Sequence, residues 1–201
     1  MYLTGTQRLT TDRLVLRRLT VDDAQQMYDN WASDPEVTTF LTWPTHSSVD
    51  VSRSVVGSWV ESYDDPGTFN WGIELIEDGI LIGQTSVVET KLSVGLVNVG
   101  YVIGRRWWGK GYCTEALIAV MDYLFSVAQA NKVEASHDPA NVASQRVMEK
   151  AGLVTEGLRR ASCLSGSTIR DQLYHGILAS EWKLHQRGST SEHSAQQRST
   201  I

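Results

Sequence analysis

Apolar residues along the chain recur at two spacings, and each spacing predicts one kind of element. Between residues 69 and 75 large apolar side chains occupy every second position, which is typical of a half-buried strand. Between residues 51 and 63 they recur every third or fourth position, which predicts an amphipathic helix. Along the whole chain these patterns predict helices at 20–31, 51–63, 112–129 and 141–151, and strands at 13–19, 69–75, 80–90, 97–103, 132–136, 153–158 and 168–182, with the end of the last segment open to a helical turn.

Turn and cap residues set the limits of several elements. Asp78-Gly79 predicts a tight hairpin, and a second turn at 93–95 adds a third consecutive antiparallel strand. Asn141 is placed as the N-cap of the last helix, and Gly152 follows its final turn. The sequence therefore predicts a mostly antiparallel sheet accompanied by helices.

Residues 97–115 combine a strand, a glycine-containing turn and the start of the long helix. Gly109 and Gly111 let the backbone approach a ligand closely, and the first four N–H groups of a helix have no partner within it. Because those groups also carry the positive end of the helix dipole, the turn suits a phosphate. A plain connector between strand and helix explains the same residues, so the turn alone leaves both interpretations open.

Composition narrows the class of protein. A net charge of −5 over 201 residues argues against the broad basic face of a nucleic-acid-binding protein, so no nucleic-acid partner is expected. The two cysteines and five histidines show no metal-ligand spacing, so no metal is expected. No apolar run resembles a signal-peptide core or a membrane span, which predicts a cytoplasmic protein without membrane contact.

Two segments lack a clear periodicity. Residues 37–46 are apolar and aromatic but contain a proline, which favours a packed loop over a loop that contacts substrate. Residues 187–201 are polar and poor in apolar side chains, so a disordered tail is expected there.

Two separated motifs, at residues 108–116 and 141–153, resemble those of one enzyme family, the GNAT superfamily of acetyl-coenzyme A dependent N-acetyltransferases, and in particular its RimJ/RimL-like branch. The first, which resembles the pyrophosphate-binding loop of the family, is Trp108-Gly109-Lys110-Gly111-Tyr112-Cys113-Thr114-Glu115-Ala116. It departs from the usual pattern at Trp108, where Gln or Arg is common, and at Cys113, where Gly or Ala is common. The second, which resembles the NxxS helix of the family, is Asn141-Val142-Ala143-Ser144 followed by Met148-Glu149-Lys150-Ala151-Gly152-Leu153.

The resemblance implies a fold and an activity for residues 8–184, taken as a single GNAT domain. The implied fold is α/β (α+β), a mixed, mostly antiparallel central sheet flanked by helices, with a splayed strand pair that holds acetyl-CoA. The implied activity is direct transfer of acetyl from acetyl-CoA to a primary amine in a ternary complex, by a monomer or homodimer. The acceptor is either a protein N-terminus or a small amine. The alternative is a non-catalytic module that binds or senses acyl-CoA.

The family also implies which residues bind acetyl-CoA. The strand before the glycine turn pairs with the pantetheine arm, and the turn binds the pyrophosphate through backbone amides. Carried over to this sequence, the cofactor-binding residues are Tyr101, Val102, Ile103, Trp108, Gly109, Lys110, Gly111, Tyr112, Cys113, Thr114 and Asn141. Arg105, Arg106 and Lys110 either add charge attraction for the phosphates or form a solvated basic turn, and Arg146 is a further candidate.

Amine attack on a thioester needs an oxyanion donor, an acid for the leaving thiolate and a base for the amine. The implied oxyanion donor is a backbone N–H of Val102 or Tyr101. Many family members protonate the thiolate with a tyrosine at the position that Met148 occupies here, so the resemblance assigns this role to Ser144. A serine that satisfies local backbone groups is the alternative for Ser144.

The general base stays unassigned. Asn98 occupies the place of a glutamate found in some relatives and cannot act as a base. Glu156 recurs in the branch, although a structural ion pair explains it equally well. Glu89, His46 and His175 are further candidates, and a water relay is compatible with the sequence.

Cys113 lies at the expected start of the long helix, where a thiol can be acidified. Direct transfer in a ternary complex needs no cysteine nucleophile. We therefore interpret Cys113 as a packing residue.

Overall fold

The computed structural model describes residues 1–165 and 168–184, and the tail expected at 187–201 lies outside the described residues. Within them one sheet has the strand order β1-β2-β3-β4-β5-β6-β8-β7. Its strands are β1 (Leu9–Thr10), β2 (Leu14–Arg17), β3 (Asn70–Leu75), β4 (Leu81–Lys91), β5 (Leu96–Ile103), β6 (Lys132–His137), β7 (Val154–Ser165) and β8 (Thr168–Leu178). Neighbouring strands are antiparallel except β5 and β6, which confirms the mixed, mostly antiparallel sheet.

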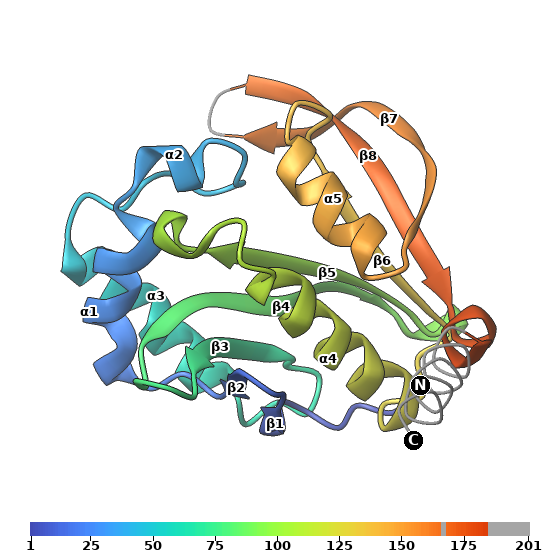
Figure 1. Cartoon of the computed structure of the whole chain (residues 1–201), viewed down its shortest axis with the longest axis horizontal. Helices are drawn as coiled ribbons and strands as arrows, with labels where there is room; N and C mark the ends of the chain where they lie inside the picture. The colour runs from blue at the N-terminus through green and yellow to red at the C-terminus, as the bar shows by residue number, and fades with distance from the viewer. Residues whose placement is uncertain (166–167, 185–201) are drawn as a thin grey trace, which may run out of the picture.

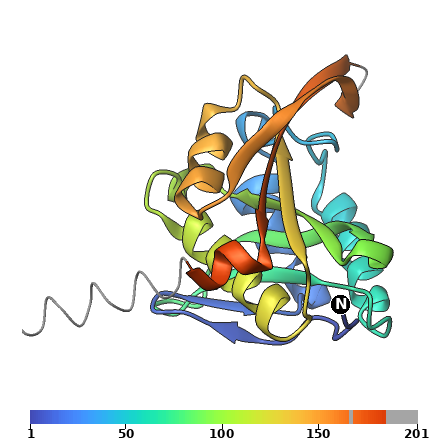
Figure 2. The ribbon, with the colours of Figure 1, turned by 90° about the vertical axis from the view of Figure 1, so that its right-hand side faces the viewer.

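The helices lie on both faces of this sheet (Figures 1 and 2). A continuous helical segment contains η1 (Val21–Asp23), α1 (Ala24–Met27) and the π-helical η2 (Tyr28–Ala32), and is followed by α2 (Pro35–Thr38) and α3 (Val49–Ser62). Short 3₁₀ turns, η3 (Leu92–Val94) and η4 (Arg105–Trp107), flank β5, and α4 (Tyr112–Ser126) and α5 (Val142–Lys150) complete the set. In the described parts of the chain no helix is long and apolar enough to cross a lipid bilayer.

Two apolar clusters fill the space between the sheet and its helices. The larger one joins the strands to α4 and α5, and the smaller one joins them to α1 and α3. Strand β5 serves both, because Val97 and Val99 belong to the larger cluster and Val102 to the smaller one. Successive side chains of a strand point to opposite faces, so β5 lies at the centre of the molecule.

Strands β5 and β6 pair over a short length and then separate. Leu96–Asn98 pairs with Lys132–Glu134, and the remainder of β5 has no register with β6. Figure 1 shows the two strands diverging toward the side on which α2 lies. This divergence matches the splayed strand pair expected from the sequence.

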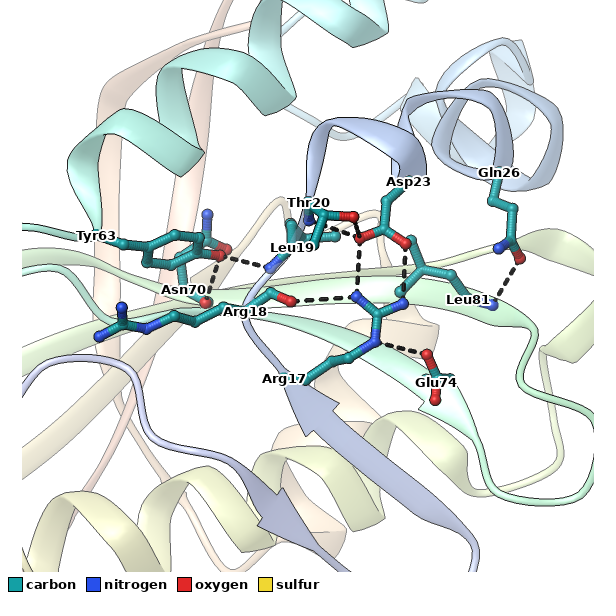
Figure 3. A network of polar contacts seen from close by, with 10 residues as sticks. All are labelled: Arg17, Arg18, Leu19, Thr20, Asp23, Gln26, Tyr63, Asn70, Glu74 and Leu81. Atoms are coloured by element: carbon teal, nitrogen blue, oxygen red, sulfur yellow. Dashed lines mark hydrogen bonds and ion pairs between the residues drawn. The ribbon is translucent and has the colours of Figure 1, made fainter.

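An ionic network fixes the α1 segment to the sheet (Figure 3). The Arg17 guanidinium of β2 contacts Asp23 at 2.8 Å and Glu74 of β3 at 2.6 Å. Burial alone would raise the pKa of Asp23, but hydrogen bonds from Arg17 and Thr20 lower it below its usual value. Because the Asp23 carboxylate also accepts from the Thr20 N–H at 2.7 Å, the same group caps the helical segment and anchors it.

The predicted boundaries need some correction. The first strand covers 14–17 rather than 13–19, and the short β1 before it was not predicted. The long helix ends at 126 rather than 129. Strand β7 extends to 165 rather than 158, with register shifts that interrupt its ladder. Strand β8 ends at 178, and 179–184 are helical, as the open end of that segment allowed.

Candidate active site

A cleft of about 570 Å³ opens where β5 diverges from β6. Its walls come from the end of β5, the turn before α4, one side of α5 and the α2 segment. Most of the residues expected to bind acetyl-CoA line this cleft, namely Tyr101, Val102, Ile103, Trp108, Gly109, Gly111, Tyr112, Cys113, Thr114 and Asn141, and so does Ser144. Lys110 is exposed and is not part of the lining.

The glycine turn has the backbone conformation that its residues favour. Gly109 and Gly111 have φ angles of 74° and 84°, in the left-handed region that other residues rarely adopt. Gly111 is the N-cap of α4, and no side chain in the described residues caps this helix. The first-turn N–H groups of α4 lie at the edge of the cleft, and no capping side chain in the described part of the chain accepts a hydrogen bond from them.

The start of α4 is held in place by Arg13, the residue before β2. Arg13 forms an ion pair with Glu115 at 2.6 Å and donates a hydrogen bond to the Lys110 carbonyl at 3.0 Å. The turn is therefore anchored at a side chain of α4 and at its own backbone. This arrangement directs the Lys110 carbonyl toward Arg13.

The basic residues near the turn have different surroundings. Arg105 is paired with Asp34 at 2.8 Å and with Glu36 at 3.0 Å, so it links η4 to the α2 segment. Arg106 stacks over Trp107, with 5.5 Å from its guanidinium carbon to the ring centroid. Two other basic residues line the cleft, both on α5. They are Arg146, a weaker candidate in the sequence, and Lys150.

Lys150 lines the cleft but was not predicted from the sequence as a binding residue. The signal was available, because residues four apart lie on one helical face. Arg146 and Lys150 therefore form a basic stripe along the cleft side of α5.

The segment 37–46 both packs and faces the cleft, so the packed loop favoured from the sequence describes only part of it. Val37 is buried in the smaller apolar cluster, and Phe40 and Leu41 are half-buried. All three, together with Glu36, line the cleft opposite the cofactor motifs. This wall was missed because the segment has no periodicity that would indicate an exposed face.

Ser144 lies in the first turn of α5 and contacts a tyrosine of β5. The Asn141 side chain accepts a hydrogen bond from the Ser144 N–H at 3.1 Å, which confirms the predicted N-cap. The Tyr101 hydroxyl oxygen lies 2.9 Å from Ser144 Oγ and 3.2 Å from the Ser144 carbonyl oxygen, so its single hydrogen has two acceptors within reach. The sequence had indicated Tyr101 for its backbone alone.

The backbone groups at the end of β5 point alternately to β4 and to the cleft. The Gly104 N–H donates to Ile82 on the β4 side, whereas the Ile103 carbonyl accepts from the Trp108 indole on the other side. Because backbone groups alternate along a strand, the N–H of Val102 lies on the β4 side with that of Gly104. The N–H of Tyr101 lies on the diverging side, so of the two expected oxyanion donors Tyr101 is better placed than Val102.

The carboxylates considered as bases lie outside the cleft lining. Glu156 is ion-paired with Lys132 at 2.6 Å, which supports its structural interpretation. Glu89 is an exposed side chain paired with Lys91 at 3.4 Å. The general base therefore stays unassigned.

The histidines considered as bases are also outside the lining. His46 is bonded to Ser52 Oγ at 2.8 Å, and His175 to His137 at 3.1 Å. Burial lowers the pKa of both His46 and His175, and the neighbouring His137 further lowers that of His175.

Cys113 behaves as a packing residue. It is partly buried against the larger apolar cluster. Burial raises the pKa of the Cys113 thiol to about 12, so the acidified thiol that a helix start can produce is not formed here.

A mixed sheet that diverges beside the first turns of two helices agrees with the fold that the two motifs implied. Residues 13–154 match the family model described as acetyltransferase (GNAT) domain. The chain therefore belongs to the GNAT acetyltransferase family, and the acyltransferase class expected from its motifs is confirmed.

Individual relatives agree with this assignment. The chain is 30% identical to the uncharacterized N-acetyltransferase p20 of Bacillus licheniformis, over 77% of this chain and 86% of that protein. It is 27% identical to the [ribosomal protein uS5]-alanine N-acetyltransferase of Escherichia coli, over 87% of this chain and 92% of that protein, which supports the RimJ/RimL-like branch. A GNAT-family acetyltransferase structure from Bacillus anthracis superposes with a TM-score of 0.76 at 25% identity, covering 87% of this chain and 99% of that one.

Proposed function

We propose that this protein transfers acetyl from acetyl-CoA directly to a primary amine within a ternary complex. The observation that carries the proposal is the cleft in which the glycine turn, the end of β5 and the start of α5 meet. The two motifs are about thirty residues apart in the sequence, yet both line this cleft.

The cofactor would lie along the cleft with its pyrophosphate at the turn Gly109–Thr114. The first-turn N–H groups of α4 suit an anion there, and Arg146 and Lys150 add positive charge from α5. The pantetheine arm would run beside β5, where backbone groups of Tyr101 and Ile103 face the gap left by β6.

In the proposed reaction the amine nitrogen attacks the thioester carbonyl carbon and forms the C–N bond. The Tyr101 N–H stabilises the oxyanion, and the C–S bond then breaks with its electron pair on sulfur. Ser144 gives its hydroxyl proton to the sulfur and regains a proton from the nitrogen, so the proton gained by the thiol is one lost by the amine. An ammonium acceptor first loses one further proton, which we assign to water.

The acceptor class is the open part of this proposal. The Escherichia coli relative is named for the alanine of a ribosomal protein, which supports an α-amine of a protein N-terminus as a first candidate. A small amine remains the second candidate, because the acceptor wall formed by Glu36, Val37, Phe40 and Leu41 offers both a carboxylate and apolar contacts.

An acceptor screen tests the proposal. Purified protein is incubated with acetyl-CoA and a panel containing alanine- and serine-initiated peptides, spermidine and free lysine, and thiol release is followed. We expect release with at least one acceptor and acetylation of its primary amine by mass spectrometry. Stabilisation by acetyl-CoA without turnover of any member would instead support the non-catalytic acyl-CoA sensor.

A further inference from the structure

Two hydroxyl groups meet inside the cleft from opposite walls. Tyr101 reaches in from β5 and Ser144 from α5, and their oxygens lie 2.9 Å apart. They are 43 residues apart in the sequence, so their contact depends on how α5 packs across the diverging strands. A contact of this length is a hydrogen bond of ordinary strength.

Other groups near the pair are poorly suited to protonate a leaving thiolate. Met148 is 1% exposed, belongs to the apolar core and is not part of the cleft lining, and its thioether has no proton to give. The Cys113 thiol is held protonated by burial, which raises its pKa to about 12. Among the described residues that line the cleft, Tyr101 and Ser144 are the pair of hydroxyl side chains hydrogen-bonded to each other.

The direction of this hydrogen bond matters, because Ser144 has a single hydrogen to give. If that hydrogen is directed at Tyr101, none remains for the sulfur. A phenol is the stronger donor of the two hydroxyls, and Ser144 Oγ is its nearer acceptor, at 2.9 Å against 3.2 Å for the Ser144 carbonyl. Burial, with a smaller contribution from Cys113, raises the pKa of Tyr101 against the opposing effect of the Ser144 hydrogen bond. The phenol therefore keeps its proton and remains a donor.

We propose that Tyr101 is a positioning residue for Ser144, donating its phenolic hydrogen to Ser144 Oγ so that the serine hydrogen points at the sulfur of coenzyme A. The inference rests on the proposed function and adds to it a residue whose side chain had no assigned role. The phenol keeps its proton throughout, because it acts by orientation and by polarising the serine hydroxyl. A chain of two hydrogen bonds then stabilises the thiolate as it forms.

The test uses coenzyme A itself as the probe, so it does not depend on knowing the acceptor. The ultraviolet absorbance of the bound thiolate is titrated against pH in wild type, Tyr101→Phe, Ser144→Ala and the double variant. Loss of a donor to a charged sulfur is expected to raise the thiol pKa of bound coenzyme A by roughly one unit in Ser144→Ala. Tyr101→Phe should raise it by roughly half a unit, and the double variant should match Ser144→Ala.

A matched control removes a phenolic hydroxyl elsewhere. Tyr174 donates to Gln172 at 3.2 Å and is not part of the cleft lining, so Tyr174→Phe should leave the thiol pKa of bound coenzyme A unchanged. The dissociation constant of coenzyme A, measured below its thiol pKa, should change by no more than about twofold in Tyr101→Phe, because the cleft keeps its shape. With the acceptor found in the screen, kcat should fall roughly three- to tenfold while KM for acetyl-CoA stays constant.

The outcomes separate the two proposals. A Tyr101→Phe shift that adds fully to that of Ser144→Ala would show that the tyrosine acts independently of the serine, and would overturn this inference while leaving the acetyltransferase proposal intact. Absence of any shift in Tyr101→Phe would have the same consequence. A wild-type protein that fails to bind coenzyme A would overturn the proposed function together with this inference.

Discussion

Gly111 combines a positive φ angle with a place in the proposed pyrophosphate site. Its φ of 84° would strain any side chain, and an added Cβ would lie 3.4 Å from Arg13 Nη2. Gly111→Val should therefore move the first turn of α4 and raise the dissociation constant of acetyl-CoA by about tenfold or more. Isothermal titration calorimetry measures this change directly.

The same backbone strain can be introduced far from the cleft. Gly79, in the hairpin between β3 and β4, has a φ of 70° and open space around its Cβ position. Gly79→Val should lose stability to a similar extent but bind acetyl-CoA normally. Equal loss of affinity in both variants would indicate a general effect of unfolding, and the turn would then lose its assignment.

Gly83 allows β4 to approach β5 closely beside the proposed oxyanion site. A Cβ at this position would lie 2.2 Å from the Val102 carbonyl oxygen and 2.8 Å from the Ile103 side chain. Gly83→Ala should therefore destabilise the protein by about 1–3 kcal/mol and displace the end of β5, which lowers kcat. Urea unfolding measures the first effect.

Gly57 supplies the comparison for that variant. It lies within α3, and no atom would contact its Cβ within 4 Å. Gly57→Ala should be neutral or stabilise the helix by up to about 1 kcal/mol. A Gly83→Ala variant as stable as Gly57→Ala would contradict the close approach of the two strands.

At the scale of elements, Asn141 couples the stability of α5 to the position of Ser144. Its Oδ1 accepts from the Ser144 N–H at 3.1 Å, so one hydrogen bond both caps the helix and fixes the serine backbone. Asn141→Ala should cost about 1 kcal/mol of unfolding free energy and reduce turnover, because the first turn of α5 loosens. Thermal unfolding and thiol release measure the two effects.

The aspartate variant separates the cap from other effects. Asp accepts the same hydrogen bond and suits the positive end of the helix, so Asn141→Asp should keep the stability that Asn141→Ala loses. Its added charge near the proposed phosphate site should still weaken acetyl-CoA binding. Equal stability of the two variants would show that Asn141 is not an effective cap.

Elements with local signals were predictable from the sequence, and contacts between them were not. The cap at Asn141, the hairpin at Asp78-Gly79 and the periodicities of α3 and α4 are set by residues within one turn or a few positions. Tyr101 and Ser144 are 43 positions apart in the sequence, and Arg105 is 71 and 69 positions from its partners Asp34 and Glu36. No local rule selects contacts between residues so far apart. The cofactor side of the cleft was therefore anticipated by its motifs, whereas the wall formed by 36–41 was not.

At the scale of the whole molecule, two imidazoles lie buried side by side on β6 and β8. His137 Nδ1 donates to the Asp138 carbonyl at 2.8 Å, and its Nε2 is hydrogen-bonded to His175 Nε2 at 3.1 Å. The Thr155 hydroxyl lies 3.4 Å from His175 Nδ1. Two charged rings could not form the bond between the Nε2 atoms, because both nitrogens of a charged imidazole are donors.

The carboxylates near His175 do not offset the effect of burial on its pKa. Glu149 and Glu156 raise the pKa of His175, but burial and the neighbouring His137 outweigh them and lower it. In the unfolded chain a histidine has a pKa of about 6.5. The unfolded state therefore binds more protons than the folded state just below that pH, and stability is lost as pH falls through this range.

We expect the unfolding free energy in urea to decrease from pH 7.5 to pH 5.5, with His46, whose pKa burial also lowers, contributing in the same direction. Carboxylates such as Asp23 and Glu115, whose pKa values lie below their usual range, titrate at lower pH and stay charged throughout this interval. His175→Gln should be less stable than wild type at pH 7.5, because His137 loses a partner, yet should show a smaller decrease toward pH 5.5. A decrease as large as that of wild type would place the acid sensitivity of the fold outside the β6–β8 pair, with His46 as the next position to replace.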